Sequence, residues 1–240
     1  MSAQVLTQRR TDLLACLGET GLIVLASGAP KTRNRDVSYP FRACSHFLYC
    51  TGINLPDCVL CIDSLQGSIL FVDAPTPQEV IWQGHGCQTH HTDLAGLFDV
   101  RPRDALTAWL QETVHASYPC HHLQHDQWVT QILQEALPER VCRANGALDR
   151  HLARLRVVKS SDEIEKIQHA VSASVIAHQA AMAQVYSGQY EYQLQAIVEY
   201  HCLDQGCQAM AYPSIVAGGK NGCILHYIEN DQLLESGQLV

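Results

Sequence analysis

Apolar runs separated by short polar turns fill the first third of the chain, and they predict a mixed α/β domain. Apolar positions at helical spacing predict a helix over residues 5–17, and the continuous apolar run within residues 21–26 predicts a buried strand. Residues 58–62 and 68–72 predict an antiparallel pair of strands. A further short strand is expected at residues 47–49.

Two helices are predicted in the middle of the chain. Residues 104–114 place Leu106, Trp109 and Leu110 on one face of a helix, and residues 129–137 predict a second, shorter helix. Residues 79–82 fit neither the helical nor the strand pattern clearly.

The longest helix is expected after Ser160, which forms a capping box with Glu163. Apolar positions then recur at spacings of three and four until Gly188. These positions are Ile164, Ile167, Val171, Val175, His178, Met182 and Val185. A second helix is predicted over residues 191–204, ending at Gly206.

A Gly-rich segment, residues 218–222, lies between two apolar segments that predict strands, residues 214–217 and 223–227. It lacks the spacing of a phosphate-binding loop because Asn follows the Lys, so a hairpin turn is the better interpretation. His226 then lies on the second strand, where composition alone favours a structural role over a functional one.

Composition narrows the possible functions. The 240 residues carry 16 Lys and Arg against 24 Asp and Glu, a net charge of -8 with 47% hydrophobic residues. This is a globular composition, and the acidic balance argues against nucleic acid as a partner. The longest apolar stretch, residues 13–26, is interrupted by Glu19 and is too short to span a membrane. No secretory signal is recognisable, so we expect a cytoplasmic protein without a membrane partner.

Eleven Cys residues occur along the chain, and Cys58 and Cys61 have the C-x-x-C spacing. They lie in a predicted strand, where residues three apart point to opposite faces, so neither a zinc site nor a redox pair is favoured. We interpret them as small core residues in a reducing cytosol.

Histidines are frequent in the middle of the chain, at His85, His90, His91, His115, His121, His122 and His125. The pair His121 and His125 has the i, i+4 spacing of a helical metal site but lacks the H-E-x-x-H pattern. A solvated His-rich surface is therefore favoured over a metal site.

Several motifs together resemble aminopeptidase P, the Xaa-Pro aminopeptidase of the pita-bread metallopeptidase family. They are RDVSYPFR at 35–42, SHFLYCTG at 45–52, VKS at 158–160 with EI at 163–164, AYPSIV at 211–216 and NGCILHY at 221–227. The resemblance implies a mixed-sheet α/β N-terminal domain over residues 1–152. A truncated α+β pita-bread catalytic domain would follow over residues 153–240.

The resemblance also implies a manganese-dependent hydrolase that releases an N-terminal residue preceding proline from peptides. The family uses two Mn2+ ions held by two Asp, one His and two Glu, and none of these positions falls within residues 1–240. Asp73, Asp93, Asp99 and Asp126 match no ligand motif. Only His226 matches an active-site position, that of a substrate-binding histidine. The chain is therefore expected to be a fragment without activity alone, and a homo-oligomer when full length.

Two alternatives stay open: a naturally truncated, non-catalytic interaction or oligomerisation module, and a fragment of a related prolidase-like hydrolase. The pita-bread resemblance also implies that the two helices after residue 160 expose an apolar face, which the second half of that domain would cover. We therefore expect residues 1 to about 150 to fold well and the remainder to be marginally stable alone.

Overall fold

The computed structural model of the chain describes residues 2–83, 96–115, 118–140 and 142–240. It divides into two compact units, Met1–Val158 and Lys159–Val240, and each is described by itself.

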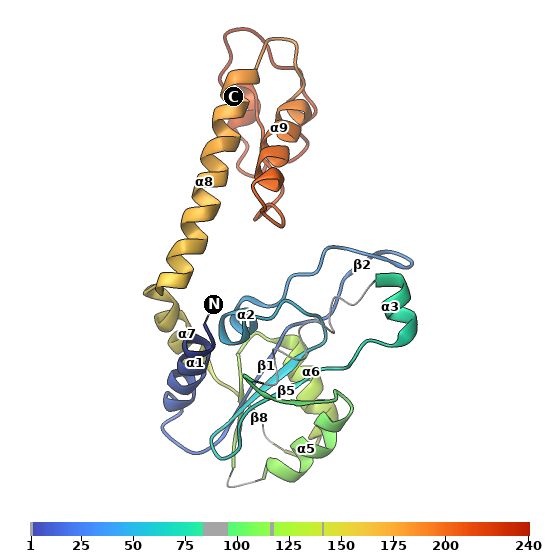
Figure 1. Cartoon of the computed structure of the whole chain (residues 1–240), viewed down its shortest axis with the longest axis vertical. Helices are drawn as coiled ribbons and strands as arrows, with labels where there is room; N and C mark the ends of the chain where they lie inside the picture. Colours follow the sequence, from blue (N-terminus) through green and yellow to red (C-terminus); the bar gives the residue numbers. More distant parts are fainter. Residues whose placement is uncertain (1, 84–95, 116–117, 141) are drawn as a thin grey trace. The chain divides into compact units, whose positions relative to one another are not determined.

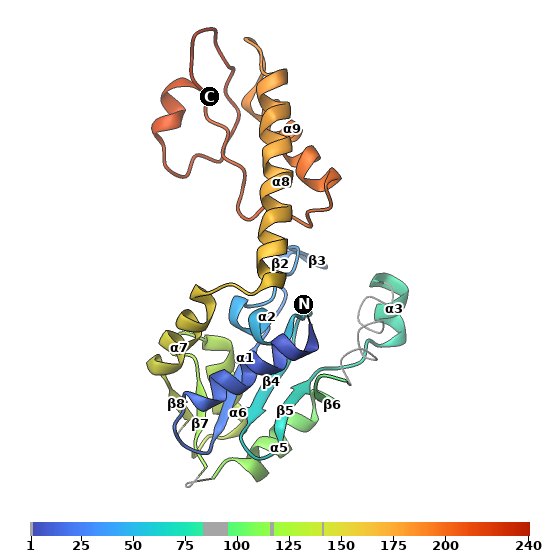
Figure 2. The same ribbon diagram turned by 60° about the vertical axis from the view of Figure 1, so that its left-hand side comes forward.

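The first unit is built on a mixed six-stranded sheet in the order β6-β5-β4-β1-β7-β8 (Figures 1 and 2). Its strands are β1 Leu22–Ala26, β4 Val59–Asp63, β5 Gly67–Phe71, β6 Asp99–Arg101, β7 Cys120–His122 and β8 Cys142–Ala144. β4 is antiparallel to both β1 and β5, while β6, β7 and β8 join in parallel. The predicted mixed sheet and its antiparallel pair are therefore confirmed.

Five helices of this unit pack on the two faces of the sheet. They are α1 Ala3–Ala15, α2 Ser45–Thr51, α5 Ala105–Thr113, α6 Gln127–Ala136 and α7 Gly146–Val157. A further helix, α3 Pro77–Gln83, adds no residue to either hydrophobic core. A separate two-stranded hairpin pairs β2 Thr32–Asn34 with β3 Val37–Ser38. The predicted helices over residues 5–17, 104–114 and 129–137 correspond to α1, α5 and α6.

The two faces of the sheet hold separate hydrophobic cores. One core packs Leu13 of α1, Phe47 of α2 and Leu148 of α7 against the sheet. The other packs Leu110 of α5 and Leu133 of α6 against the opposite face. Every residue of β1 and of β4 is buried, since alternate side chains enter one core or the other.

The strand expected at residues 47–49 is wrong, because this segment lies inside α2. Phe47 and Cys50, three residues apart, are both fully buried, which is the spacing of one helical face. The helix ends at Gly52, whose left-handed φ of 72° suits glycine. Three consecutive apolar residues could not distinguish a strand from a buried helical turn.

A buried arginine joins α1 to the sheet. Arg10 is 3% exposed and donates hydrogen bonds to the Cys50 carbonyl at 3.0 Å and to the Ser68 hydroxyl at 2.9 Å. It also donates to the Leu97 carbonyl at 3.2 Å, and its guanidinium stacks 4.4 Å from the Phe98 ring centre. Four separate chain segments thus meet at one side chain.

The second unit contains two helices, α8 Ser161–Gln184 and α9 Glu191–Asp204, and a short 3-10 helix, η1 Gly219–Cys223. The predicted capping box at the start of α8 is confirmed. The Ser160 hydroxyl accepts from the Glu163 amide at 3.4 Å, and the Glu163 carboxylate accepts from the Ser160 amide at 2.9 Å.

α8 packs against α9 but leaves its large apolar side chains exposed. Its fully buried positions are the small residues Ala173 and Ala177. Val171, Val175 and Met182 are 56%, 49% and 70% exposed. The predicted exposed apolar face is therefore confirmed, while the marginal stability inferred from it stays a prediction.

Among the described residues, no helix is both long enough and apolar enough to cross a membrane.

Candidate functional site

A buried carboxylate at the start of α9 organises the loops of the second unit. Glu191 is fully buried, and its two oxygens accept four hydrogen bonds. The amides of Gly218 and Gln232 donate at 2.8 and 3.0 Å. The side chains of Asn221 and Tyr227 donate at 3.2 and 2.6 Å. One side chain thus joins the start of α9 to the loops on both sides of η1.

These contacts determine the ionisation states of Glu191 and Tyr227. Burial by itself raises the pKa of Glu191, but the hydrogen bonds from Tyr227, Gly218, Gln232 and Asn221 outweigh it and lower the pKa below its usual range. Burial, reinforced by the hydrogen bond to Glu191, raises the pKa of Tyr227 to about 12. Glu191 is therefore a carboxylate and Tyr227 a neutral donor at neutral pH.

A second buried side chain, Asn230, holds the segment before η1. Its amide oxygen accepts from the Val216 amide at 3.0 Å. Its amide nitrogen donates to the Ser214 carbonyl and to Gln195 of α9, both at 2.8 Å. Asn230 itself has a left-handed φ of 48°, a conformation that Asn tolerates better than most residues.

The strands expected at residues 214–217 and 223–227 are wrong, and so is the hairpin turn between them. The segment 214–217 is an irregular loop, and η1 occupies Gly219–Cys223. The backbone amides of Val216 and Gly218 are bonded to the side chains of Asn230 and Glu191 rather than to a neighbouring strand. Apolar composition alone could not reveal that side chains would take these donors.

His226 lies in a turn directly before Tyr227, and not on a strand. Its side chain is exposed, whereas Tyr227 is 5% exposed and bonded to Glu191. Tyr227 therefore fixes the backbone from which His226 projects.

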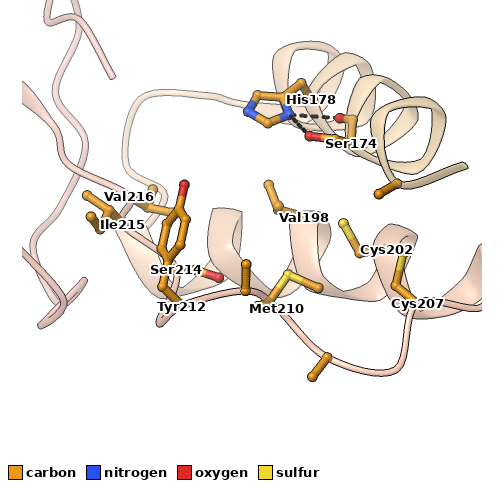
Figure 3. A pocket seen from close by; sticks show the side chains of 13 residues that line it. Ser174, His178, Val198, Cys202, Cys207, Met210, Tyr212, Ser214, Ile215 and Val216 are labelled. Carbon is orange, nitrogen blue, oxygen red and sulfur yellow. Dashed lines mark hydrogen bonds between the residues drawn. The ribbon is translucent and has the colours of Figure 1, made fainter. Parts of the chain in front are cut away.

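An apolar cavity of about 390 Å³ lies between α8, α9 and residues 207–216 (Figure 3). His178, Cys202, Cys207, Met210 and Tyr212 are among its lining residues, none of which carries a carboxylate. The Nδ1 atom of His178 lies 2.8 Å from the Ser174 carbonyl, so a neutral ring carries its proton there. The cavity could hold a small apolar group, and no sequence pattern indicated it.

Sequence profiles of known families match both units. The profile described as "Aminopeptidase P, N-terminal domain" matches residues 6–120, and that of "Metallopeptidase family M24" matches residues 165–240. The chain belongs to the aminopeptidase P family. Its predicted fold class is confirmed: a mixed α/β N-terminal domain is followed by part of an M24 domain.

Relatives in this family include the Xaa-Pro aminopeptidase of Haemophilus influenzae, 28% identical over 97% of this chain and 55% of that protein. Human Xaa-Pro aminopeptidase 3 is 30% identical over 93% of this chain and 47% of its own length. The chain thus spans about half the length of the curated relatives it matches.

Solved structures resemble the chain over nearly its whole length. Proline aminopeptidase P II from Yersinia pestis has a TM-score of 0.89 and 30% identity, over 99% of this chain and 58% of that one. The aminopeptidase PepP of Pseudomonas aeruginosa has a TM-score of 0.90 and 27% identity, over 99% and 57%. A zinc-substituted E. coli aminopeptidase P in complex with product has a TM-score of 0.87 and 25% identity, over 99% and 57%.

The residues that the structure describes do not provide the metal centre that the M24 family implies. Within the described ranges, no three His, Cys, Asp or Glu side chains come together in a group that could hold a metal ion. Asp73 accepts from the Arg103 amide, Asp99 pairs with Arg101, and Asp126 caps α6. Asp93 lies outside the described residues.

The C-x-x-C pair is confirmed as structural. Cys58 belongs to the core beside α1, and Cys61 to the core beside α5. The two thiols therefore point to opposite faces of the sheet, as the strand period requires.

The solvated interpretation of the histidines is wrong for two of them. His121 and His122 are 3% and 4% exposed, because they lie on β7 instead of on a helix. Burial lowers the pKa of His121, although Glu19 lies 3.4 Å from its Nε2. His115 and His125 are exposed, as expected. His85, His90 and His91 lie outside the described residues.

Proposed function

We propose that this chain forms part of an Xaa-Pro aminopeptidase, a hydrolase that releases an N-terminal residue preceding proline. The observation that carries the proposal is the likeness to solved aminopeptidase P, with a TM-score of 0.89 over 99% of the chain at 30% identity. The match of residues 165–240 to the M24 profile supports metal-dependent hydrolysis as the reaction class.

Within this function, His226 is assigned as a substrate-binding residue. Its exposure supports the assignment, because the side chain is free to meet a peptide. The four hydrogen bonds at Glu191 support it further, since they hold the adjacent Tyr227 and thereby the position of His226.

The cofactor is proposed to be Mn2+, as two ions, on the ground of the resemblance. The described residues assemble no group of metal donors. We therefore expect the 240-residue chain alone to release no amino acid from Xaa-Pro peptides, with or without added Mn2+.

The first measurement is the intact mass of the protein in its source cell. This chain has a mass of 26.6 kDa, whereas a protein as long as its relatives, of which it covers about half, would have about twice that mass. The larger mass would support the proposal of a working enzyme that extends beyond this chain. A mass of 26.6 kDa would contradict it.

Activity is then assayed on the protein from that source. An Xaa-Pro peptide of at least four residues should release its first residue, and the same peptide with Ala in place of Pro should not. Cleavage restricted to Xaa-Pro dipeptides would instead identify a prolidase-like hydrolase. Release by the 240-residue chain alone would refute the proposed inactivity.

His226→Ala tests the site assignment in the same protein. Losing one hydrogen bond to substrate should lower kcat/KM by about tenfold or more. His169→Ala, which removes an exposed imidazole on α8, is the matched control and should leave kcat/KM unchanged. Equal kcat/KM values for the two variants would show that His226 does not bind substrate.

A second candidate is a non-catalytic oligomerisation module. The exposed apolar face of α8, with Val171, Val175 and Met182 in contact with solvent, favours it. Light scattering of the 240-residue chain tests this candidate. A monomer at micromolar concentration would contradict an oligomerisation module.

The remaining assignments rest on the same resemblance. We propose an N-terminal domain over residues 1–152 and the first part of the catalytic domain over residues 153–240. Along the sequence, the first compact unit ends at Val158, the residue after α7. We also propose a cytoplasmic homo-oligomer acting on proline-containing peptides, although one relative, from Arabidopsis thaliana, is named as mitochondrial.

A further inference from the structure

Two cysteines of the first unit face each other across neighbouring strands. Cys120 of β7 and Cys142 of β8 are direct partners in the parallel register. Adjacent strands lie about 4.8 Å apart, within the range of about 4.4–6.8 Å between Cα atoms that a disulfide spans. Both side chains meet the core beside α5 and α6. The pair therefore has the backbone placement that a disulfide needs.

The two thiols differ in exposure and share a hydrogen bond. Cys120 is fully buried, whereas Cys142 is half-buried. The hydrogen bond between the two sulfur atoms, followed by burial, raises the pKa of Cys120. The same bond lowers the pKa of Cys142, with help from Arg140. Cys142 is thus the thiol that ionises first, with Cys120 as its hydrogen-bond donor.

Cys142 also opens onto a cavity of about 300 Å³ that polar and apolar side chains line together. Arg140, Thr130, Gln134 and His122 contribute to its wall. The Arg140 guanidinium donates to the Gln111 carbonyl at 2.8 Å, which holds the positive charge in place. A small hydroperoxide can therefore reach the sulfur of Cys142 beside groups able to hydrogen-bond its oxygens.

We propose that Cys142 is a site of oxidation by hydroperoxides and that Cys120 resolves the product into a Cys120–Cys142 disulfide. In the first step, the Cys142 thiolate attacks the terminal oxygen of ROOH and the O–O bond breaks. With one proton taken up, this gives Cys142 sulfenic acid and ROH. In the second step, the Cys120 sulfur attacks that of Cys142. The S–S bond forms, the S–O bond breaks, and the hydroxyl leaves with the Cys120 proton as water.

Three other thiols in the described part of the chain, Cys16, Cys50 and Cys61, lack this combination. Burial raises the pKa of Cys50 to about 12 and raises that of Cys61 still further. Cys16 is half-buried like Cys142, but burial raises its pKa. Oxidation should therefore select Cys142 over these three residues.

The site has a structural consequence, because β8 is a three-residue strand at the edge of the sheet. A disulfide to β7 would tie this edge and close the loop that contains α6. Closing a loop of this length should raise the melting temperature of the first unit by roughly 5–10 °C.

Peptide mapping of the intact 240-residue chain tests the proposal directly. The chain is treated with one equivalent of hydrogen peroxide, alkylated and digested with trypsin. Cys120 then lies in the peptide 104–140 and Cys142 in the tripeptide 141–143. The expected product is these two peptides joined, with the loss of two hydrogen atoms. Peroxide that oxidises other cysteines while the tripeptide stays alkylated would overturn the proposal, as would a Cys142 joined elsewhere.

Single variants separate the two steps. Cys120→Ala should leave Cys142 as a sulfenic acid that dimedone traps, and Cys142→Ser should leave Cys120 reduced. Cys16→Ser is the matched control and should give the joined peptides in the same yield as the unchanged chain. Oxidation of Cys120 in the Cys142→Ser chain, at the rate seen in the unchanged chain, would refute the assigned order.

Discussion

Removing the Glu191 carboxylate should release the loops of the second unit. Glu191→Ala leaves four donors without their acceptor: the amides of Gly218 and Gln232 and the side chains of Asn221 and Tyr227. The perturbation is local, because all five residues belong to one compact unit.

The expected magnitude follows from the number of orphaned donors. Each buried donor left unsatisfied costs about 1–3 kcal/mol, so four donors set a range of about 4–12 kcal/mol. Gln232 is exposed, so water can replace part of the loss there. We therefore expect the lower end, about 4 kcal/mol, with about 2 kcal/mol for Glu191→Gln, which keeps one acceptor oxygen.

Native-state hydrogen exchange measures this loss at the affected amides. A change of about 4 kcal/mol corresponds to roughly a thousandfold loss of protection at Gly218 and Gln232. The tryptophans Trp82, Trp109 and Trp128 all lie in the first unit, so their fluorescence reports that unit separately. The urea transition seen by fluorescence should therefore stay unchanged.

A matched control removes another carboxylate of the second unit, one whose loss leaves no buried hydrogen-bond donor without its acceptor. Glu165→Ala, at an exposed position of α8, should change the protection of Gly218 by less than threefold. If Glu191→Ala changes that protection no more than the control does, the carboxylate does not hold the loops. If the fluorescence transition shifts as well, the effect is not confined to the second unit.

Three further predictions concern both units. Arg10→Met should destabilise the first unit by about 3–5 kcal/mol, because it leaves buried carbonyls without their donor; urea unfolding followed by tryptophan fluorescence measures this loss. On α8, Val175→Asn at an exposed position should lower the free energy of unfolding by less than about 0.5 kcal/mol. Ala177→Leu at a buried position should lower it by about 1–3 kcal/mol, because the larger side chain overpacks the contact with α9. Hydrogen exchange measures both losses. The lowered pKa of Glu191 means that its contribution to stability is complete above the ordinary value of 4.5. As the pH falls through the lower folded value the contribution disappears; exchange at Gly218, corrected for intrinsic rates, should lose this pH dependence in Glu191→Gln.

The start of α8 and the buried strands were predictable because each leaves a local signal, whereas the end of α8 at Gln184 comes before the expected Gly188. The run Leu22–Leu25 and the pair of strands at residues 58–62 and 68–72 are recognisable because both faces of a central strand are buried. The capping box at Ser160 is recognisable because two residues at a fixed spacing form it. The family resemblance rested on longer motifs, which carry more information than any periodicity.

Short segments were not predictable, since their conformation depends on distant residues. Residues 47–49 form part of a helix because Phe47 faces a core built from α1, α7 and the sheet. His121 and His122 are buried because β7 enters between β1 and β8, a pairing that only the folded topology reveals. A histidine-rich segment forms a solvent-exposed surface only when the backbone around it is exposed.

The largest error, at residues 214–227, has a single physical cause. A run of apolar residues predicts a strand only if its backbone amides donate to the carbonyls of a neighbouring strand. In the second unit, however, the buried apolar cluster consists of Leu194, Val216 and Leu234, with few partners packed around it. With so small a core, the buried polar side chains Glu191 and Asn230 decide where the loops lie. The same contacts explain why an exposed histidine can have a fixed backbone, because His226 precedes the tyrosine that Glu191 holds. If the polar contacts do this, variants of Glu191 and Asn230 should affect the loops more than variants of any exposed apolar residue on α8.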